Sequence, residues 1–179
     1  MSIVIPVKPK PTPSESLQAR GAVFISSTPE QRADWLDRTL WSLKLAWEEE
    51  CAISHYMRAY RLPRGSVLFH EGDHDAFCAI VIAGALEIRK GDLEEHQRIV
   101  AKLGAGKMVG EMSLIDGASR SASAVALEDT DLLVLTRDDF DVMAERHPQH
   151  ALRFAMMVAE AIANLLRQTT GALVEHLHG

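Results

Sequence analysis

The sequence predicts a mixed α/β (α+β) protein, in which a jelly-roll β-barrel is flanked by an N-terminal helical extension and a long C-terminal helix. Three observations predict this class. A helical apolar period without Gly or Pro occupies residues 30–62. Short apolar or alternating runs separated by turn signals then fill residues 66–136, and a helical period returns after Pro148.

Composition bounds the class of protein. With 179 residues, of which 47% are hydrophobic, the chain can form one domain with a core plus an extension. A formal charge of −6 argues against a surface devoted to nucleic acid or anionic lipid, so we expect neither a nucleic acid nor a membrane partner. Cys51 and Cys78 lie far apart in apolar surroundings, which indicates reduced thiols in a cytoplasmic protein. No segment is apolar enough to cross a bilayer, and residues 1–7 are too short for a signal-peptide core.

Residues 1–27 are expected to form a flexible Pro-rich arm, because prolines at positions 6, 9, 11 and 13 remove backbone donors and favour extended chain. An alternative is that Ile3, Val4 and Ile5 add as a short strand to a sheet edge.

Residues 28–60 are expected to form a helical segment. Thr28 can cap a helix, Pro29 suits its first position, and Gln31 completes a capping box. Apolar residues then recur at helical spacing, at Leu36, Leu40, Leu43, Trp47 and Cys51. This stripe predicts one helix, or two with a bend, packed on the domain or on another subunit; an aromatic box for a ligand is the rarer use of such a pattern.

Residues 61–147 are expected to form the barrel. The predicted strands cover residues 66–69, 77–82, 85–89, 97–103, 121–127 and 132–136. Many short strands at close spacing are typical of a sandwich or jelly roll.

Residues 148–179 are expected to form a lid or dimerisation helix with a tail. The helix is predicted from Gln149 to Gln168, with Gly171 as its stop. It is apolar nearly all round, so we expect one face to cover the barrel and the other to meet the same helix in a homodimer.

The stretch 109–124 has the chemistry of a ribose-phosphate site. Gly110 allows close approach of the backbone, and free N–H groups of a short helix starting at Glu111 can face an anion. Arg120, in a run of small residues after the Asp116-Gly117 turn, presents a planar fork of donors that suits a phosphate. Glu111 only accepts hydrogen bonds, so it suits a sugar hydroxyl.

Gly110-Glu111, a short helix, a turn and then Arg120-Ser121-Ala122 resemble the phosphate-binding cassette of cyclic nucleotide-binding domains. That family includes bacterial catabolite activators and cyclic-nucleotide-dependent kinases. The resemblance extends to the entry strand and glycine turn in residues 62–73 and to the hairpin in residues 77–88. It covers roughly the last two-thirds of the chain.

The resemblance implies a ligand-binding set for this sequence. Arg120 would anchor the phosphate and Glu111 the ribose, with Ile88 and Leu103 as apolar walls. The remaining contacts would come from Gly110, Met112, Ser113, Ser121 and Ala122, and one of Asn164, Arg167 or Gln168 would cap the base. Ser121 directly after the arginine leans towards cAMP, with cGMP and cyclic dinucleotides still open.

The resulting hypothesis is a cyclic nucleotide sensor without catalysis or cofactor, which signals through helix rearrangement. Only residues 169–179 follow the predicted helix, too few for a helix-turn-helix. The output is therefore expected to be a separate protein effector, the N-terminal extension or a change in dimerisation. One alternative is a partner-binding protein with a non-functional pocket. Another is a cupin-like metalloprotein using His70 and His74; we expect no metal, because the two histidines straddle a turn and no third stands on a downstream strand.

Overall fold

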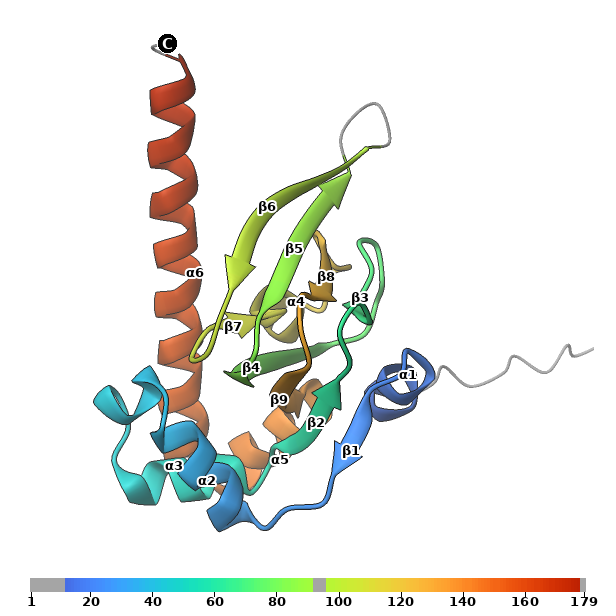
Figure 1. Cartoon of the computed structure of the whole chain (residues 1–179). Coiled ribbons are helices and arrows are strands. Elements are labelled where there is room, and N and C mark those ends of the chain that lie inside the picture. Colours follow the sequence, from blue (N-terminus) through green and yellow to red (C-terminus); the bar gives the residue numbers. More distant parts are fainter. Residues whose placement is uncertain (1–11, 92–95, 178–179) are drawn as a thin grey trace, which may run out of the picture.

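The computed structural model describes residues 12–91 and 96–177, with side chains as far as residue 171. Its strands form two antiparallel sheets (Figure 1). The five-stranded sheet has the order β1 (Val23–Ile25), β2 (Arg58–Leu62), β9 (Thr130–Thr136), β4 (Phe77–Ala83) and β7 (Met108–Val109). The four-stranded sheet has the order β3 (Val67–Phe69), β8 (Ser123–Ala126), β5 (Leu86–Gly91) and β6 (Gln97–Leu103).

The two sheets make an open β-sandwich within the described part of the chain, in agreement with the sandwich or jelly roll that the strand pattern predicted. The mixed α/β class and the flanking helices are confirmed. Three of the strands, β1, β2 and β7, were not predicted from the sequence. Strand β1 lies in the segment assigned to an arm, and β2 crosses the boundary between the segments assigned to helix and barrel. Strand β7 has only two residues, too few for a periodic signal.

The predicted flexible arm is wrong for residues 13–25, which are ordered on the domain. Thr12 and Glu15 form a capping box that starts α1 (Pro13–Ala19), and β1 follows as an edge strand. Leu17 is buried inside the sandwich, so its apolar side chain fixes α1 to the domain. The alternative strand at Ile3, Val4 and Ile5 lies outside the described residues.

The single apolar stripe predicted for residues 36–51 is divided among separate elements. These are α2 (Pro29–Asp37), a 3₁₀ turn η1 (Leu40–Leu43) and α3 (Trp47–Ser54). Leu36 is buried, whereas Leu43 remains 81% exposed, because the turn between the helices rotates the helical period out of phase. The capping box at Thr28 and Gln31 is formed as predicted.

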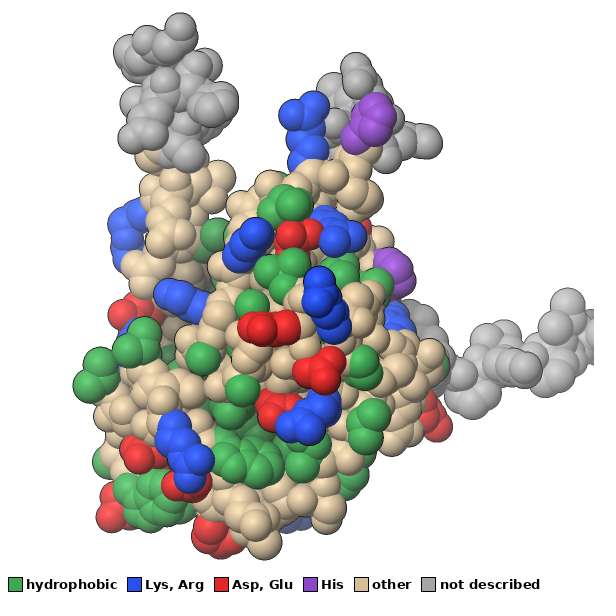
Figure 2. Space-filling model, in the orientation of Figure 1, with side chains coloured by type: hydrophobic (Ala, Val, Ile, Leu, Met, Phe, Trp, Pro, Cys, Tyr) green, Lys and Arg blue, Asp and Glu red, His purple; other side chains and the backbone are tan. Residues whose placement is uncertain are grey.

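The C-terminal helix is longer than predicted. After α5 (Arg137–Arg146), α6 extends from Pro148 to Leu177, through the expected stop at Gly171. Its first half packs on α3, α4 (Glu111–Asp116) and α5. Its distal part extends away from the helical layer and is separated from the β5–β6 hairpin (Figures 1 and 2). None of the helices within the described residues is both long and apolar enough to cross a membrane.

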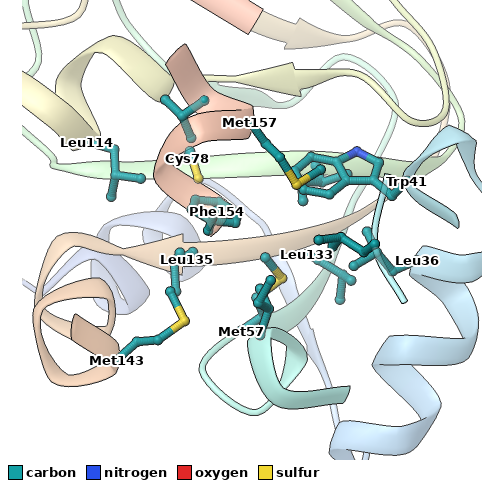
Figure 3. Close-up of a cluster of buried hydrophobic side chains, with 14 of the residues drawn as sticks. Leu36, Trp41, Met57, Cys78, Leu114, Leu133, Leu135, Met143, Phe154 and Met157 are labelled. Atoms are coloured by element: carbon teal, nitrogen blue, oxygen red, sulfur yellow. The ribbon is translucent and has the colours of Figure 1, made fainter. Parts of the chain in front are cut away.

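The adjacent strands β4 and β9 of the five-stranded sheet are buried on both faces, which explains their continuous apolar runs. One face meets the second sheet around Tyr60, Phe77 and Leu86. The opposite face meets the helices through Cys78, Leu133 and Leu135 of the sheet (Figure 3). Trp41 stacks on Phe154 of α6 at a ring-centroid distance of 5.9 Å and donates to the Gly106 carbonyl at 3.0 Å. This contact joins η1, α6 and the sandwich.

Candidate functional site

Arg120 occupies the interior of the sandwich as a buried cation. Its side chain is 2% exposed, and its guanidinium lies 4.1 Å from the ring centroid of Phe69 and 4.3 Å from that of Phe77. Nη1 donates to the Gly110 carbonyl at 3.0 Å, while Nε and Nη2 are buried without a partner in the part of the chain that the structure describes. Burial lowers the pKa of Arg120 to about 10, which still leaves it charged at neutral pH.

Two free donors on a buried charge are energetically unfavourable. Each unsatisfied buried donor costs about 1–3 kcal/mol, and more when the group is charged. Nε and Nη2 lie on one edge of the guanidinium plane, which is the edge that binds two oxygens of one anion. The site is therefore arranged for an anionic ligand.

The backbone of Arg120 is fixed by the loop between β3 and β4. Its N–H donates to the Asp73 carbonyl at 2.8 Å, and its carbonyl accepts from the Gly72 N–H at 2.9 Å. Phe69 and Phe77, which stack on the guanidinium, lie at the two ends of this same loop. One segment thus holds both the main chain and the side chain of Arg120.

Gly110 is required by Arg120 itself. Its φ is +79°, and a Cβ at this position would lie 2.4 Å from Nη1 of Arg120 and 2.9 Å from the Phe77 carbonyl oxygen. The sequence predicted close approach to a ligand; the structure shows that the close neighbour is the arginine. Gly110 also begins α4, whose first turn has no side-chain cap, and Gly117 ends it with φ +67°.

Glu111 is the first residue of α4 and is half-buried. Burial raises the pKa of its carboxyl, while its own backbone N–H and the charge of Arg120 oppose that change. The charge of Arg120 therefore acts on the carboxyl of Glu111 in a partly desolvated site.

The remaining predicted residues of the cassette have different surroundings. Ser113 is buried and its carbonyl accepts from the Gly117 N–H, whereas the Met112 side chain is exposed. Ser121 is exposed and Ala122 half-buried. The carbonyl of Ser121 accepts from Nζ of Lys90 at 2.6 Å, which adds a cation beside the cassette that the sequence had not indicated.

Ile88 and Leu103 lie on β5 and β6 and pack, half-buried, against the same cluster that surrounds Arg120. In contrast, Asn164, Arg167 and Gln168 are exposed on the distal part of α6. Arg167 donates to the side-chain oxygen of Asn164 within the helix. The structure therefore does not bring the predicted base-capping residues to the cassette.

Phe69, Phe77 and Asp73 belong to the site as supports of Arg120, although no chemical role had been predicted for them. An aromatic residue on each side of a glycine turn was the only signal in the sequence. His70 and His74 flank this turn as well; across the described residues no group of three His, Cys, Asp or Glu side chains could hold a metal ion.

Comparison with known proteins gives a consistent result. Residues 60–147 match the family model described as "Cyclic nucleotide-binding domain". The Cyclic AMP receptor protein of Thermus thermophilus is 37% identical over 115 residues, which cover 64% of this chain and 53% of that protein. The chain thus spans about half the length of this relative.

Two solved structures share the fold. One is a cyclic nucleotide-binding domain from Methylobacillus flagellatus KT, with a TM-score of 0.76, 26% identity, and coverage of 87% of this chain and 89% of that one. The other is the regulatory domain of Toxoplasma gondii PKA with cAMP, with a TM-score of 0.55, 26% identity, and coverage of 64% of this chain and 43% of that one. Residues 60–147 therefore belong to the cyclic nucleotide-binding domain family.

Proposed function

We propose that the chain is a non-catalytic sensor that binds a cyclic nucleotide between its two sheets, with Arg120 as the phosphate anchor. The observation that carries this proposal is the pair of buried, unpartnered donors Nε and Nη2 on Arg120. A cyclic phosphate presents two oxygens that can accept from both donors at once, which would remove the unfavourable desolvation. The same donors disfavour a non-functional pocket, where nothing would offset their burial.

Glu111 would accept a hydrogen bond from the ribose hydroxyl. The carboxyl accepts this hydrogen bond more strongly when it is ionised. Burial raises its pKa and disfavours ionisation, whereas the charge of Arg120 favours it. The N–H groups of α4 at Gly110, Met112 and Ser113 would face the phosphate, since no side chain caps this helix start.

Ile88 and Leu103 would form the apolar wall for the ribose and base, with Ser121 and Ala122 beside the phosphate. Two observations support this assignment: both side chains pack on the interior cluster, and both are only partly buried. Their remaining apolar surface is available for a ligand to cover. Ser121 after the arginine favours cAMP over cGMP by resemblance, in line with the cAMP named for the Toxoplasma structure.

Signalling would depend on α6. Asn164, Arg167 and Gln168 are exposed, so a base-capping role requires the distal helix to move towards the sheet of β5 and β6. A ligand that contacts the closed arrangement better than the open one shifts the population towards closure. The effector that reads this change would be a separate protein or the second subunit.

Dimerisation through α6 is supported by its exposed face. Leu152, Met156 and Leu166 are exposed by 65%, 60% and 66%, and with Ala159 and Ala163 they follow alternating steps of four and three residues. This heptad spacing is that of a coiled-coil seam. We therefore propose a homodimer in which two copies of α6 pair along this seam.

The test is isothermal titration calorimetry with cAMP and cGMP on the wild-type protein, Arg120→Ala and Arg120→Lys. A charge-assisted hydrogen bond nets about 1.5–3 kcal/mol, so Arg120→Ala should weaken binding at least about tenfold. Lys keeps the charge but lacks the planar fork, so its affinity should fall between the two.

Arg61→Ala is the matched control, because Arg61 is exposed and paired with Asp131 outside the cassette. A wild-type protein that binds none of these nucleotides would refute the proposed function. Equal affinities of wild type and Arg120→Ala would refute the anchor.

A further inference from the structure

We propose that Arg20, in the N-terminal extension outside the matched domain, is a positioning residue for Arg120. It would hold the β3–β4 loop and neutralise two carboxylates beside the phosphate site. This inference rests on the proposed function, because the consequence of positioning Arg120 is nucleotide affinity.

The position of Arg20 is fixed by α1. Arg20 follows the last residue of α1 and caps its C-terminus. Leu17 of α1 is 1% exposed within the sandwich cluster, and Ser14 accepts a hydrogen bond from the Tyr60 hydroxyl at 2.9 Å. The guanidinium of Arg20 is thus carried by an element that is packed into the domain.

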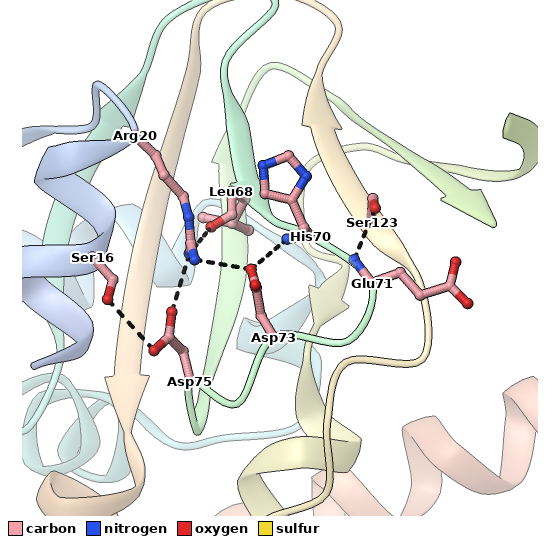
Figure 4. A network of polar contacts seen from close by, with 8 residues as sticks. All are labelled: Ser16, Arg20, Leu68, His70, Glu71, Asp73, Asp75 and Ser123. Carbon is pink, nitrogen blue, oxygen red and sulfur yellow. Dashed lines mark hydrogen bonds and ion pairs between the residues drawn. The ribbon is translucent and has the colours of Figure 1, made fainter. Parts of the chain in front are cut away.

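Arg20 binds two carboxylates of the β3–β4 loop and one carbonyl of strand β3 (Figure 4). Nη2 lies 2.8 Å from Oδ2 of Asp73, Nη1 lies 3.1 Å from Oδ2 of Asp75, and Nη1 also donates to the Leu68 carbonyl at 3.1 Å. The side chains of Arg20, Asp73 and Asp75 are only 21%, 27% and 18% exposed, so solvent screens this network less than a surface ion pair.

The same loop residues hold Arg120. The Asp73 carbonyl accepts from the Arg120 N–H at 2.8 Å, while the Asp73 carboxylate accepts from Arg20 and from the His70 N–H at 2.7 Å. Asp73 therefore contacts both arginines through different atoms of one residue. A shift of this loop would move the backbone of Arg120 and the two rings that stack on it.

Charge gives Arg20 a second effect. The charges of Asp75 and Asp73 act on the pKa of Arg120 in the opposite direction to the charge of Arg20. Without Arg20, the loop would present two uncompensated carboxylates to an incoming cyclic phosphate. An anionic ligand would then be repelled, most strongly at low ionic strength.

The experiment measures cAMP affinity by titration calorimetry at low and high salt for wild type, Arg20→Ala and Arg20→Lys. Arg61→Ala is the control, because it removes the same charge from an exposed pair on β2 and β9. We expect Arg20→Ala to weaken binding about fivefold at low salt, the upper range for a single partly exposed ion pair. The loss should shrink at high salt, and Arg20→Lys should recover part of it.

A second variant tests whether the removal of one carboxylate compensates for the loss of Arg20. Adding Asp75→Asn to Arg20→Ala should restore part of the low-salt affinity, because it removes one uncompensated carboxylate. Unchanged affinity in Arg20→Ala, or a loss that neither salt nor Asp75→Asn reduces, would overturn the proposed role.

A ligand-free measurement separates this inference from the proposed function. The Nε–H signal of Arg120 can be followed by NMR and assigned through its absence in Arg120→Lys. We expect Arg20→Ala, but not Arg61→Ala, to shift it; an unshifted signal would overturn the positioning role even if wild type binds no cyclic nucleotide. If Arg20→Ala shifts the signal but the wild-type protein binds no cyclic nucleotide, only the proposed function is refuted.

Discussion

Glu50 makes the stability of this protein dependent on pH. It lies on α3 with 0% exposure, and neither of its carboxyl oxygens has a hydrogen-bond partner among the described residues. Burial, followed by the charge of Asp37, raises the pKa of Glu50 from 4.5 to about 7. The ionised form is therefore disfavoured in the folded state relative to the unfolded chain, where the carboxyl is hydrated.

The sign follows from proton binding. Below about pH 4.5 the carboxyl is protonated in both states and has no pH-dependent effect. Between that pH and about pH 7 the folded state retains the proton and the unfolded state releases it, so the free energy of unfolding decreases as pH rises. Above about pH 7 the loss is complete and amounts to about 3 kcal/mol.

Urea denaturation of wild type and Glu50→Gln at a series of pH values measures this effect. At high pH the glutamine should stabilise the protein by up to about 3 kcal/mol, or raise the melting temperature by about 2–4 °C per kcal/mol. This advantage should disappear at low pH, where Glu50 is neutral. Glu48→Gln, an exposed site on the same helix, should show no such trend. If the difference between wild type and Glu50→Gln is the same at every pH, Glu50 does not titrate in the folded state as described.

Three further substitutions test the site and the dimer. Gly110→Ala places a Cβ 2.4 Å from Nη1 of Arg120 at a φ of +79°, so we expect a destabilisation of about 1–3 kcal/mol and weaker cAMP binding. Urea denaturation and calorimetry check both effects, and unchanged binding would contradict the contact. Wild-type cAMP affinity should fall as pH decreases through the raised pKa of Glu111, because the ionised carboxyl is the stronger acceptor for the ribose. Calorimetry at several pH values should show a flatter profile for Glu111→Gln, and parallel profiles would remove Glu111 from the site. Leu166→Glu should convert the dimer to a monomer in analytical ultracentrifugation, because it places a charge in the proposed seam. Leu43→Glu, at another exposed leucine, is the control, and a wild type that is already monomeric would exclude the seam.

Residues that are close in sequence were sufficient to predict many strands and turns of the sandwich. The turn at Asp116-Gly117, the glycine at position 110 and the arginine ten residues later are close in sequence, so their order predicted a ribose-phosphate site and carried the resemblance to the cassette. Runs such as residues 77–82 and 132–136 predicted strands, because short apolar runs bounded by turn residues are typical of buried strands. The capping signal at Thr28 likewise depends only on neighbouring residues.

Contacts between distant segments decided the rest. Four prolines predicted a mobile arm, but Leu17 finds a buried position among strands far along the chain, and this packing orders residues 13–25. Gly171 was expected to end α6, yet a glycine inside a helix costs only about 1 kcal/mol, which a long helix tolerates. The apolar stripe of residues 36–51 was divided, because η1 and α3 each pack separately on α6 and the sheet.

The chemistry of the site shows the same division. The identity of Arg120 and its spacing from Glu111 are properties of the sequence. The two unpaired donors, the two adjacent phenylalanine rings that contact the guanidinium and the link through Asp73 to Arg20 exist only when the β3–β4 loop, the cassette and α1 meet. Burial by these three segments leaves two donors of Arg120 desolvated and unpaired, and burial is a property of the tertiary structure.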